Sequence, residues 1–429
     1  MSHLSVAFVF LAVSSPIWTF LSGTARAEIS AMPSGPTISV ENPSALERAY
    51  LTLSGHADGG GTILLAPNFP PGGEIALKVG GPHPVHITST DPARPARISR
   101  IALSGVDNLR MSHLHIDSTG VARAKNHRDI DIIRSGRLAI VDSTFTSNGS
   151  TTFNPSDPNA VLGERLSMIR HVKDMTFARN RVSGYEQGLT LKEADGVTIS
   201  DNEITAMQGD GIRLVGVQDV LIKNNDMYDF SATPNEFTHS DFIQMWSHRA
   251  ETISRNITIT GNVFDTGNGV AVQPIFMRNI AYERGNKTHI YQNIEITDNL
   301  IYTGAANGIA IGRANEVLIA SNTLLWNPDA VTVKANGNTS WPPRILIENG
   351  VTNARVMGNL ATKIAIGSGV FTSGNVLMSW VPADRTYAGR HFVNVARGGD
   401  IGPKGWRLRP DSPWVGAGAP ASQPNRDPT

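Results

Sequence analysis

The chain has 429 residues, 40% of them hydrophobic, which is enough to bury a large core in one elongated domain or in two or three compact ones. Its 37 basic and 37 acidic residues give a formal net charge of zero, so bulk electrostatics do not favour nucleic acid or an anionic membrane surface as a partner. The absence of cysteine excludes a scaffold held together by disulfides.

The first segment, residues 1–27, has the pattern of a secretory signal peptide. The apolar run LSVAFVFLAVSSPIWTFL is followed by SGTARA, in which Ala25-Arg26-Ala27 fits the small-x-small rule for cleavage before Glu28. The length of the apolar run leaves an uncleaved membrane anchor as the alternative. We therefore expect an exported bacterial protein, periplasmic or secreted, that leaves the membrane after cleavage and has no later membrane span.

A recurring phrase, apolar-x-apolar-x-x-Asn, dominates the middle of the sequence. It ends on seven asparagines spaced by 22, 23, 37, 37, 23 and 37 residues: Asn180, Asn202, Asn225, Asn262, Asn299, Asn322 and Asn359. A unit of this length, sometimes extended by an insertion, is typical of a solenoid whose coils share one cross-section. Segments such as VTIS, VLIK and ITIT alternate as strands do and are rich in β-branched residues.

Three short strands per coil account for this length and predict an all-β fold, a parallel β-helix. Each strand would pair with its equivalents about 4.8 Å above and below, and the inward side chains would stack in aliphatic columns. The repeated asparagine has a structural explanation, because its amide can bond the equivalent asparagine and the turn backbone and tolerates left-handed φ. We expect the β-helix over residues 28–398 and a C-terminal capping segment and tail over 399–429, which covers the last coil.

Two segments that frame the repeat resemble parts of a known group of proteins. NPSALERAYLTLSGHADGGGTILLAPNFPP resembles the capping helix, Gly-rich turn and first strand of right-handed parallel β-helix carbohydrate-active proteins. This group contains pectate lyases, polygalacturonases, alginate and chondroitin lyases and mannuronan C5-epimerases. GWRLRPDSPWVGAGAP is similar to the ending of bacterial members. The resemblance covers most of residues 37–418 and implies a right-handed β-helix with an N-terminal capping helix, a carbohydrate ligand and a monomer.

Alignment of the coils on the repeated phrase arranges polar residues in outward-facing columns along the first strand of each coil. The column at the strand entry reads Gln187, Asp210, Asp241, Asn268, Asn307 and Asp329, and Arg213 and Gln244 lie in mid-strand. The column at the strand exit reads Arg170, Lys192, Val215, Trp246, Gln273, Gly312 and Lys334.

Insertions at 231–240, 279–293 and 334–345 leave from the ends of the same strand. They are expected to wall a groove suited to a polymer. Within it, Trp246, Tyr282, Tyr291 and Trp341 are candidates for stacking on sugar rings.

Asp210 and Asp241 occupy equivalent places on adjacent coils. Side-by-side carboxylates push one pKa upward, which is how a pair divides into acid and base. The structural alternative is that each aspartate caps its own turn. His239 lies in the loop beside Asp241 and titrates near neutrality, so it is a further acid or base candidate.

Lys192 and Arg213 suggest a different chemistry, elimination at a uronate. A uronate lyase neutralises the sugar carboxylate, removes the C5 proton with a base and protonates the leaving O4. Lys192 beside Arg170 would be the base, because a neighbouring cation favours the neutral amine. The interval between Lys192 and Arg213 resembles that of the Lys and Arg on consecutive coils of alginate and chondroitin B lyases. The calcium ligands of that family, Glu-x-Glu, are replaced by Tyr185 and Gln187.

The other members of the group match less well. The inter-coil pairing of Asp210 and Asp241 loosely resembles that of polygalacturonases, but the Arg-x-Lys element of those enzymes is absent. The Asp-Pro-His motif of mannuronan epimerases is also absent.

The sequence therefore predicts an exported polysaccharide lyase that cleaves an acidic, uronate-containing polysaccharide or oligosaccharide by β-elimination. The alternatives are a glycoside hydrolase that uses Asp210 and Asp241, a uronate C5-epimerase, and a non-catalytic polysaccharide-binding protein of the periplasm. No metal-binding motif has convincing spacing, and Ca²⁺ held by carboxylates and carbonyls is the one cofactor considered. The catalytic candidates are Asp210, Arg213, His239, Asp241 and Lys192, and the substrate-binding candidates are Arg170, Gln244, Trp246, Gln273, Arg278 and Lys334.

Overall fold

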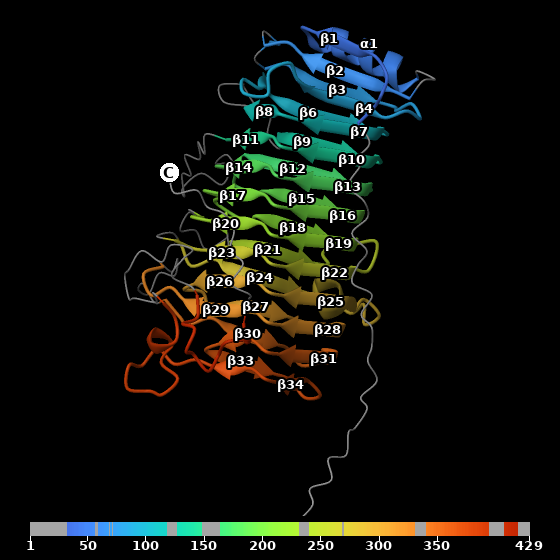
Figure 1. Ribbon diagram of the computed structural model, residues 1–429. Coiled ribbons are helices and arrows are strands. Elements are labelled where there is room, and N and C mark those ends of the chain that lie inside the picture. Colours follow the sequence, from blue (N-terminus) through green and yellow to red (C-terminus); the bar gives the residue numbers. More distant parts are fainter. Residues whose placement is uncertain are drawn as a thin grey trace, which may run out of the picture.

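The computed structural model of the protein is a single stack of coils (Figure 1). Among the described residues, no helix is both long and apolar enough to cross a membrane. The predicted signal peptide lies outside the described residues, and so do His239 and Lys334. The structure describes residues 32–55, 59–67, 69–70, 72–117, 127–147, 164–230, 240–267, 270–330, 340–393 and 407–418.

Three parallel sheets run along the stack, and a typical coil gives one strand to each in the order B, A, C (Figure 1). Sheet B consists of β3 (Glu74–Lys78), β6 (Arg100–Ser104), β9 (Arg128–Ile133), β12 (Arg165–Arg170), β15 (Leu189–Lys192), β18 (Ile212–Val215), β21 (Asp241–Trp246), β24 (Gln273–Arg278), β27 (Asn307–Ile311), β30 (Arg344–Ile347) and β33 (Lys363–Ile366).

The other two sheets follow the same order along the stack. Sheet A consists of β1 (Thr37–Val40), β2 (Gly61–Leu65), β4 (Val85–Ser89), β7 (Asp107–Ser112), β10 (Gly136–Val141), β13 (Lys173–Ala178), β16 (Asp195–Ser200), β19 (Gln218–Lys223), β22 (Arg255–Thr260), β25 (Tyr291–Thr297), β28 (Ala314–Ala320), β31 (Thr352–Met357) and β34 (Phe371–Ser373). Sheet C consists of β5 (Ala96–Ile98), β8 (Leu114–Asp117), β11 (Thr144–Thr146), β14 (Arg181–Ser183), β17 (Glu203–Thr205), β20 (Asp226–Tyr228), β23 (Val263–Asp265), β26 (Leu300–Thr303), β29 (Thr323–Trp326), β32 (Leu360–Ala361) and β35 (Val376–Leu377).

The core is built from stacked aliphatic columns, as predicted. Alternate side chains of each strand point inward, so residues in register on successive coils pack on one another. One column of sheet B is buried throughout and runs through Ile132, Ile169, Leu191, Leu214 and Met245. The three-strand coil and the parallel β-helix fold are therefore confirmed.

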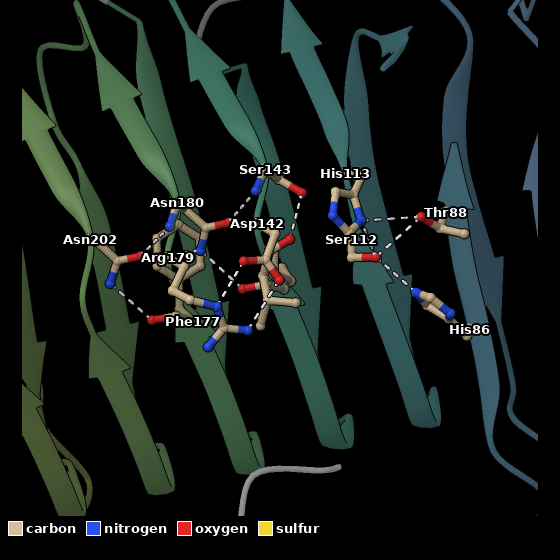
Figure 2. Close-up of polar contacts among 12 residues, drawn as sticks. His86, Thr88, Ser112, His113, Asp142, Ser143, Phe177, Arg179, Asn180 and Asn202 are labelled. Carbon is tan, nitrogen blue, oxygen red and sulfur yellow. Dashed lines mark hydrogen bonds and ion pairs between the residues drawn. The ribbon is translucent and has the colours of Figure 1, made fainter. Parts of the chain in front are cut away.

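The asparagine ladder is also confirmed, and it has one unexpected feature. The backbone N–H and side-chain amide of Asn225 both donate to Asn262 Oδ1, each at 2.9 Å, and neighbouring rungs repeat this pattern. Figure 2 shows the first rungs of the ladder, where Asn180 bonds Asn202. The left-handed φ belongs to the residue before each asparagine, such as Arg179 (φ 54°), and not to the asparagine itself. The preceding residue turns the chain, and the asparagine side chain then points into the stack.

The two ends of the stack are finished differently. Helix α1 (Pro43–Ser54) begins at the N-cap Asn42, and it buries Leu46 and Leu53 against the first strands. The described C-terminal residues, including Trp414, pack instead on the outer face of sheet C around Leu325 and Leu360.

The last coil is consequently exposed, with Phe371 58% and Leu377 53% accessible. The described residues of the predicted capping segment thus pack on sheet C, whose apolar outer face attracts them, and residues 399–406 and 419–429 lie outside the described part of the chain. Two short helices complete the structure, α2 (Ile280–Glu283) and η1 (Ala388–Arg390).

Candidate functional site

The predicted site residues that the structure describes lie along sheet B, in its strands or just before them. Asp210 lies two residues before β18, and the others lie in β12, β15, β18, β21 and β24. Parallel register places Arg170 beside Lys192, Arg213 beside Gln244, Asp241 beside Gln273, and Trp246 beside Arg278. The stacking of coils therefore brings together side chains far apart in the sequence.

The register corrects three positions in the predicted columns. Gln273 lies opposite Asp241 at the strand entry, and Arg278 takes the expected place of Gln273 beside Trp246. Opposite Asn307 stands Arg344, where Asp329 was expected. The error has a physical cause, because extra residues precede some sheet B strands and follow others. Spacing counted from the asparagine ladder cannot distinguish these two arrangements.

Asp210 is held by a hydrogen bond from the next coil and by an ion pair within its own coil. Its Oδ1 accepts the backbone N–H of Asp241 at 3.1 Å, and its Oδ2 lies 3.2 Å from Arg213 Nε. The first contact is the turn-capping role that was weighed against catalysis. The second contact is an ion pair that fixes the guanidinium of Arg213.

Asp241 has a side chain with 0% exposure. Its Oδ2 accepts from Gln244 Nε2 at 2.8 Å, and its Oδ1 accepts from Gln273 Nε2 at 3.1 Å. Gln273 Oε1 accepts in turn from Asn307 Nδ2, and Asn307 Oδ1 accepts from Arg344 Nε, each at 3.0 Å. Because a fully buried carboxylate cannot touch a polymer at the surface, this geometry favours a positioning role for Asp241.

Arg213 has two neighbours that hold its guanidinium group. Its guanidinium carbon lies 4.9 Å from the ring centroid of Trp246, in addition to the ion pair with Asp210. Only 15% of its side chain is exposed. A planar cation held by a carboxylate and an aromatic face has lost most of its conformational freedom before a ligand binds. Its guanidinium group is therefore preorganised.

Lys192 and Arg170 form a pair of like charges on adjacent coils. The two residues are in register, so only one strand spacing, about 4.8 Å, separates their backbones. Lys192 Nζ lies 4.0 Å from Glu251 Oε1, a long contact to an exposed partner, and Arg170 Nη2 lies 3.4 Å from Asp131 Oδ1. Such weak surface pairs leave both cations available to a bound anion.

Five charged residues of this face were not predicted: Arg100, Arg128, Asp131, Arg165 and Glu186. Arg100 Nη2 lies 3.4 Å from Asp131 Oδ2, and Arg128 stands in register with Arg165. Burial raises the pKa of the Glu186 carboxyl, against the opposing effect of Arg165 and Arg213. Burial also lowers the pKa of Arg128, partly offset by Asp131.

A signal for these residues was present in the sequence. The coil before Asn180 carries Ser143 at the ladder position, where its backbone N–H donates to Asn180 Oδ1. Registration on asparagine therefore omitted this coil, which holds Arg128 and Asp131, and the coil before it, which holds Arg100. The strand segments RIALS, RDIDII and RLSMIR each begin with arginine, which would have extended the alignment.

The aromatic candidates divide into buried and accessible groups. Tyr291 is fully buried and donates its hydroxyl to the carbonyl of Arg278, so its predicted stacking on a sugar is wrong. Tyr282 is covered by cations, with Lys287 Nζ 4.2 Å and Arg313 Cζ 5.2 Å from its ring. Trp341 is 57% exposed and Trp246 is partly exposed, so both stay candidates.

The described ranges contain no group of three or more His, Cys, Asp or Glu side chains arranged to hold a metal ion.

Comparisons with known proteins identify the fold. The family model described as the right handed beta helix region matches residues 98–272 and 168–342. No curated protein sequence matches the chain.

Similar solved structures include an alginate lyase from Paenibacillus sp., with 16% identity over 73% of this chain and 98% of that chain and a TM-score of 0.42. The surface adhesin PfbA of Streptococcus pneumoniae has 12% identity over 83% and 97% of the two chains, with a TM-score of 0.47. DFA-IIIase from Arthrobacter chlorophenolicus, without its lid, has 11% identity over 84% and 97%, with a TM-score of 0.47. At these values the likeness concerns the fold and carries no argument about activity.

Proposed function

This chain belongs to the family of right-handed β-helix proteins, and we propose that it is an exported enzyme that acts on acidic polysaccharides. The reaction is β-elimination at a uronate, and the site is the outer face of sheet B around Lys192 and Arg213. Export to the periplasm or the medium follows from the N-terminal sequence pattern, and the working form is a monomer.

One observation carries this proposal: three cations lie on three consecutive coils of sheet B. Arg170 and Lys192 are in register, and Arg213 lies one coil further on, opposite Thr190. Glu186 precedes β15 and feels both Arg165 and Arg213. A cationic row of this kind binds a polymer of carboxylates, whereas a neutral glycan gains little from it.

The chemistry assigns one role to Arg213 and one to Lys192. Arg213, fixed by Asp210 and Trp246, binds the uronate carboxylate and so stabilises the negative charge that develops when C5 loses its proton. Lys192, as the neutral amine, takes that proton. The electron pair forms the C4–C5 double bond while the C4–O4 bond breaks. The departing O4 takes its proton from water, because Glu186 lies before the start of β15 whereas Lys192 lies at its end.

The hydrolase alternative has less support from this geometry. Both of its carboxyl groups would have to reach the glycosidic bond or the attacking water. Asp241 is fully buried between Gln244 and Gln273, and Asp210 is nearly buried against Arg213. These aspartates fit the support of the site better than contact with the sugar.

The test is the ultraviolet absorbance of the unsaturated sugar end, measured on a panel of uronate polymers. We expect the wild-type protein to produce this signal, and Lys192→Ala to reduce the turnover by about 100-fold or more while the melting temperature stays the same. Lys173→Ala, an exposed lysine of sheet A, is the matched control and should leave turnover unchanged.

Other outcomes would replace the proposal. New reducing ends without the absorbance would indicate hydrolysis. Solvent deuterium at C5 without chain cleavage would indicate epimerisation. Binding without any product would indicate a non-catalytic polysaccharide-binding protein.

A further inference from the structure

We propose that Arg100, Arg128 and Arg165 form a second carboxylate-binding subsite on sheet B, so that the polymer lies along the axis of the β-helix. The inference rests on the proposed function and deepens it. It implies that the substrate carries consecutive acidic units and that binding strengthens when the oligomer is long enough to fill both places.

The subsite is created by three successive strands of sheet B that each begin with arginine. Arg100 opens β6, Arg128 opens β9 and Arg165 opens β12. Arg128 and Arg165 are in register, and Arg100 Nε donates to the carbonyl of Arg128 at 3.2 Å. The three guanidinium groups therefore extend from neighbouring points on the same end of the sheet.

The arrangement is unfavourable for the empty protein. Like charges directly opposite each other in a sheet destabilise it. Within the described residues, Asp131 pairs with Arg100 and Arg170, Glu74 lies 3.7 Å from Arg100, and no ion pair reaches Arg128 or Arg165. The in-register arginines thus retain charge that a bound anion would neutralise.

Unused hydrogen-bonding capacity points in the same direction. The Nε atoms of Arg128, Arg165 and Arg170 are buried and find no partner in the described part of the chain. Burial also lowers the pKa of Arg128, Asp131 opposes this effect, and the nearby Arg165, Arg170 and Arg100 lower the pKa further. The fold thus holds four arginines close enough for their like charges to repel one another. Such an arrangement is expected of a site that binds an anion.

A carboxylated sugar chain fits this geometry better than a single small anion. A guanidinium group binds a carboxylate through two parallel hydrogen bonds, and successive coils repeat every ~4.8 Å. The coil of Arg128 lies two coils before that of Lys192. The two places for an acidic unit are therefore separated by ~10 Å along the stack. A polymer that crossed the sheet along the strands would meet only one of them.

The experiment compares the affinity of the protein for oligouronates of two and four sugars, measured by isothermal titration calorimetry. In the double variant Arg128→Gln/Arg165→Gln we expect the affinity for the tetramer to fall by about tenfold or more, and that for the dimer to change much less. The control Arg255→Gln removes an exposed arginine of sheet A and should change neither affinity. The carboxyl-reduced tetramer, which is neutral, should bind weakly to every form of the protein.

Stability measurements separate a binding role from a structural one. Removal of one partner of an in-register pair of like charges should maintain or raise the ligand-free melting temperature, so we expect Arg165→Gln to be at least as stable as wild type. Arg165→Lys should recover part of the tetramer affinity. A loss of folding in both variants, or an equal loss of dimer and tetramer binding, would overturn the subsite.

The proposal of the subsite and the proposal of lyase activity can be disproved separately. If unsaturated product forms but the preference for the tetramer survives Arg128→Gln/Arg165→Gln, the subsite is wrong and the lyase stands. If no product forms but tetramer binding still depends on these arginines, the lyase is wrong and the subsite stands.

Discussion

The asparagine ladder and the outer face of sheet B are both rows of polar side chains repeated along the same coils, yet they differ in what their polar atoms bond. Asn262 Nδ2 donates to Ile222 O, Thr260 O and Asn299 Oδ1, and its Oδ1 accepts twice from Asn225. On sheet B, by contrast, Arg128 Nε and Glu186 Oε2 are buried without a partner among the described residues. A row whose polar atoms hydrogen-bond to one another maintains the fold, whereas a row with unbonded polar atoms is suited to binding a ligand.

Figure 2 shows that buried polar contacts between coils are not restricted to asparagine, although His86 Nδ1 is buried without a partner among the described residues. His86 Nε2 lies 2.8 Å from Ser112 Oγ, and Ser112 Oγ donates to Thr88 Oγ1 at 3.2 Å. Burial, assisted by Arg110 and His113, lowers the pKa of His86 to about 4, so this histidine stays neutral near pH 7. A buried polar cluster on sheet A can therefore be chemically diverse and still serve the packing of coils.

The largest expected effect comes from breaking the ladder. Asn262→Ala removes the acceptor of two buried Asn225 donors and leaves the carbonyl of Ile222 without its amide partner. Since each unsatisfied buried group costs about 1–3 kcal/mol, we expect a loss of about 3–5 kcal/mol in the free energy of unfolding. Urea denaturation measures this loss, and the exposed Asn349→Ala is the control. A variant as stable as the wild type would show that the ladder is not the structural row.

The next prediction distinguishes a structural role of Asp241 from a direct catalytic one. Asp241→Ala leaves the buried amides of Gln244 and Gln273 without their acceptor, so we expect it to lower the free energy of unfolding by about 2–4 kcal/mol. The exposed Asp411→Ala should have no effect on the same denaturation curve. Lost turnover with unchanged stability would instead return Asp241 to a direct catalytic role.

The smallest effect concerns Glu186 and depends on pH. Because its pKa is raised in the folded state, the folded protein holds this proton more tightly than the unfolded chain. Stability is therefore greatest below the ordinary carboxyl range and declines as pH rises from there through the raised pKa. Glu186→Gln should remove this decline, so the variant should melt higher than the wild type at neutral pH and equally in acid.

Thermal melting across this pH range checks the prediction. Glu47→Gln, at an exposed position of helix α1, is the control and should follow the wild-type curve. A Glu186→Gln variant that melts lower than the wild type at neutral pH would show that the ionised carboxylate stabilises the fold.

The sequence by itself determined the coil, the ladder and the sheet that carries the candidate site. An asparagine at one turn and alternating aliphatic residues recur along the chain, and their spacing alone fixes which segments stack. Arg170, Lys192, Arg213 and Trp246 could be assigned to one outer face for this reason, since strand alternation decides which side chains point outward.

Only the tertiary structure decided which neighbour each side chain meets. A coil with an insertion before its sheet B strand can be as long as a coil with the insertion after that strand. The spacing therefore does not reveal the register, and only the structure shows that Gln273 lies beside Asp241 and Arg278 beside Trp246. Burial was equally hard to predict, because Asp241 is held by the amides of Gln244 in its own strand and Gln273 in the next coil. The repeat fixes the order of the coils, whereas hydrogen bonding and charge between coils determine which polar groups are left for a ligand.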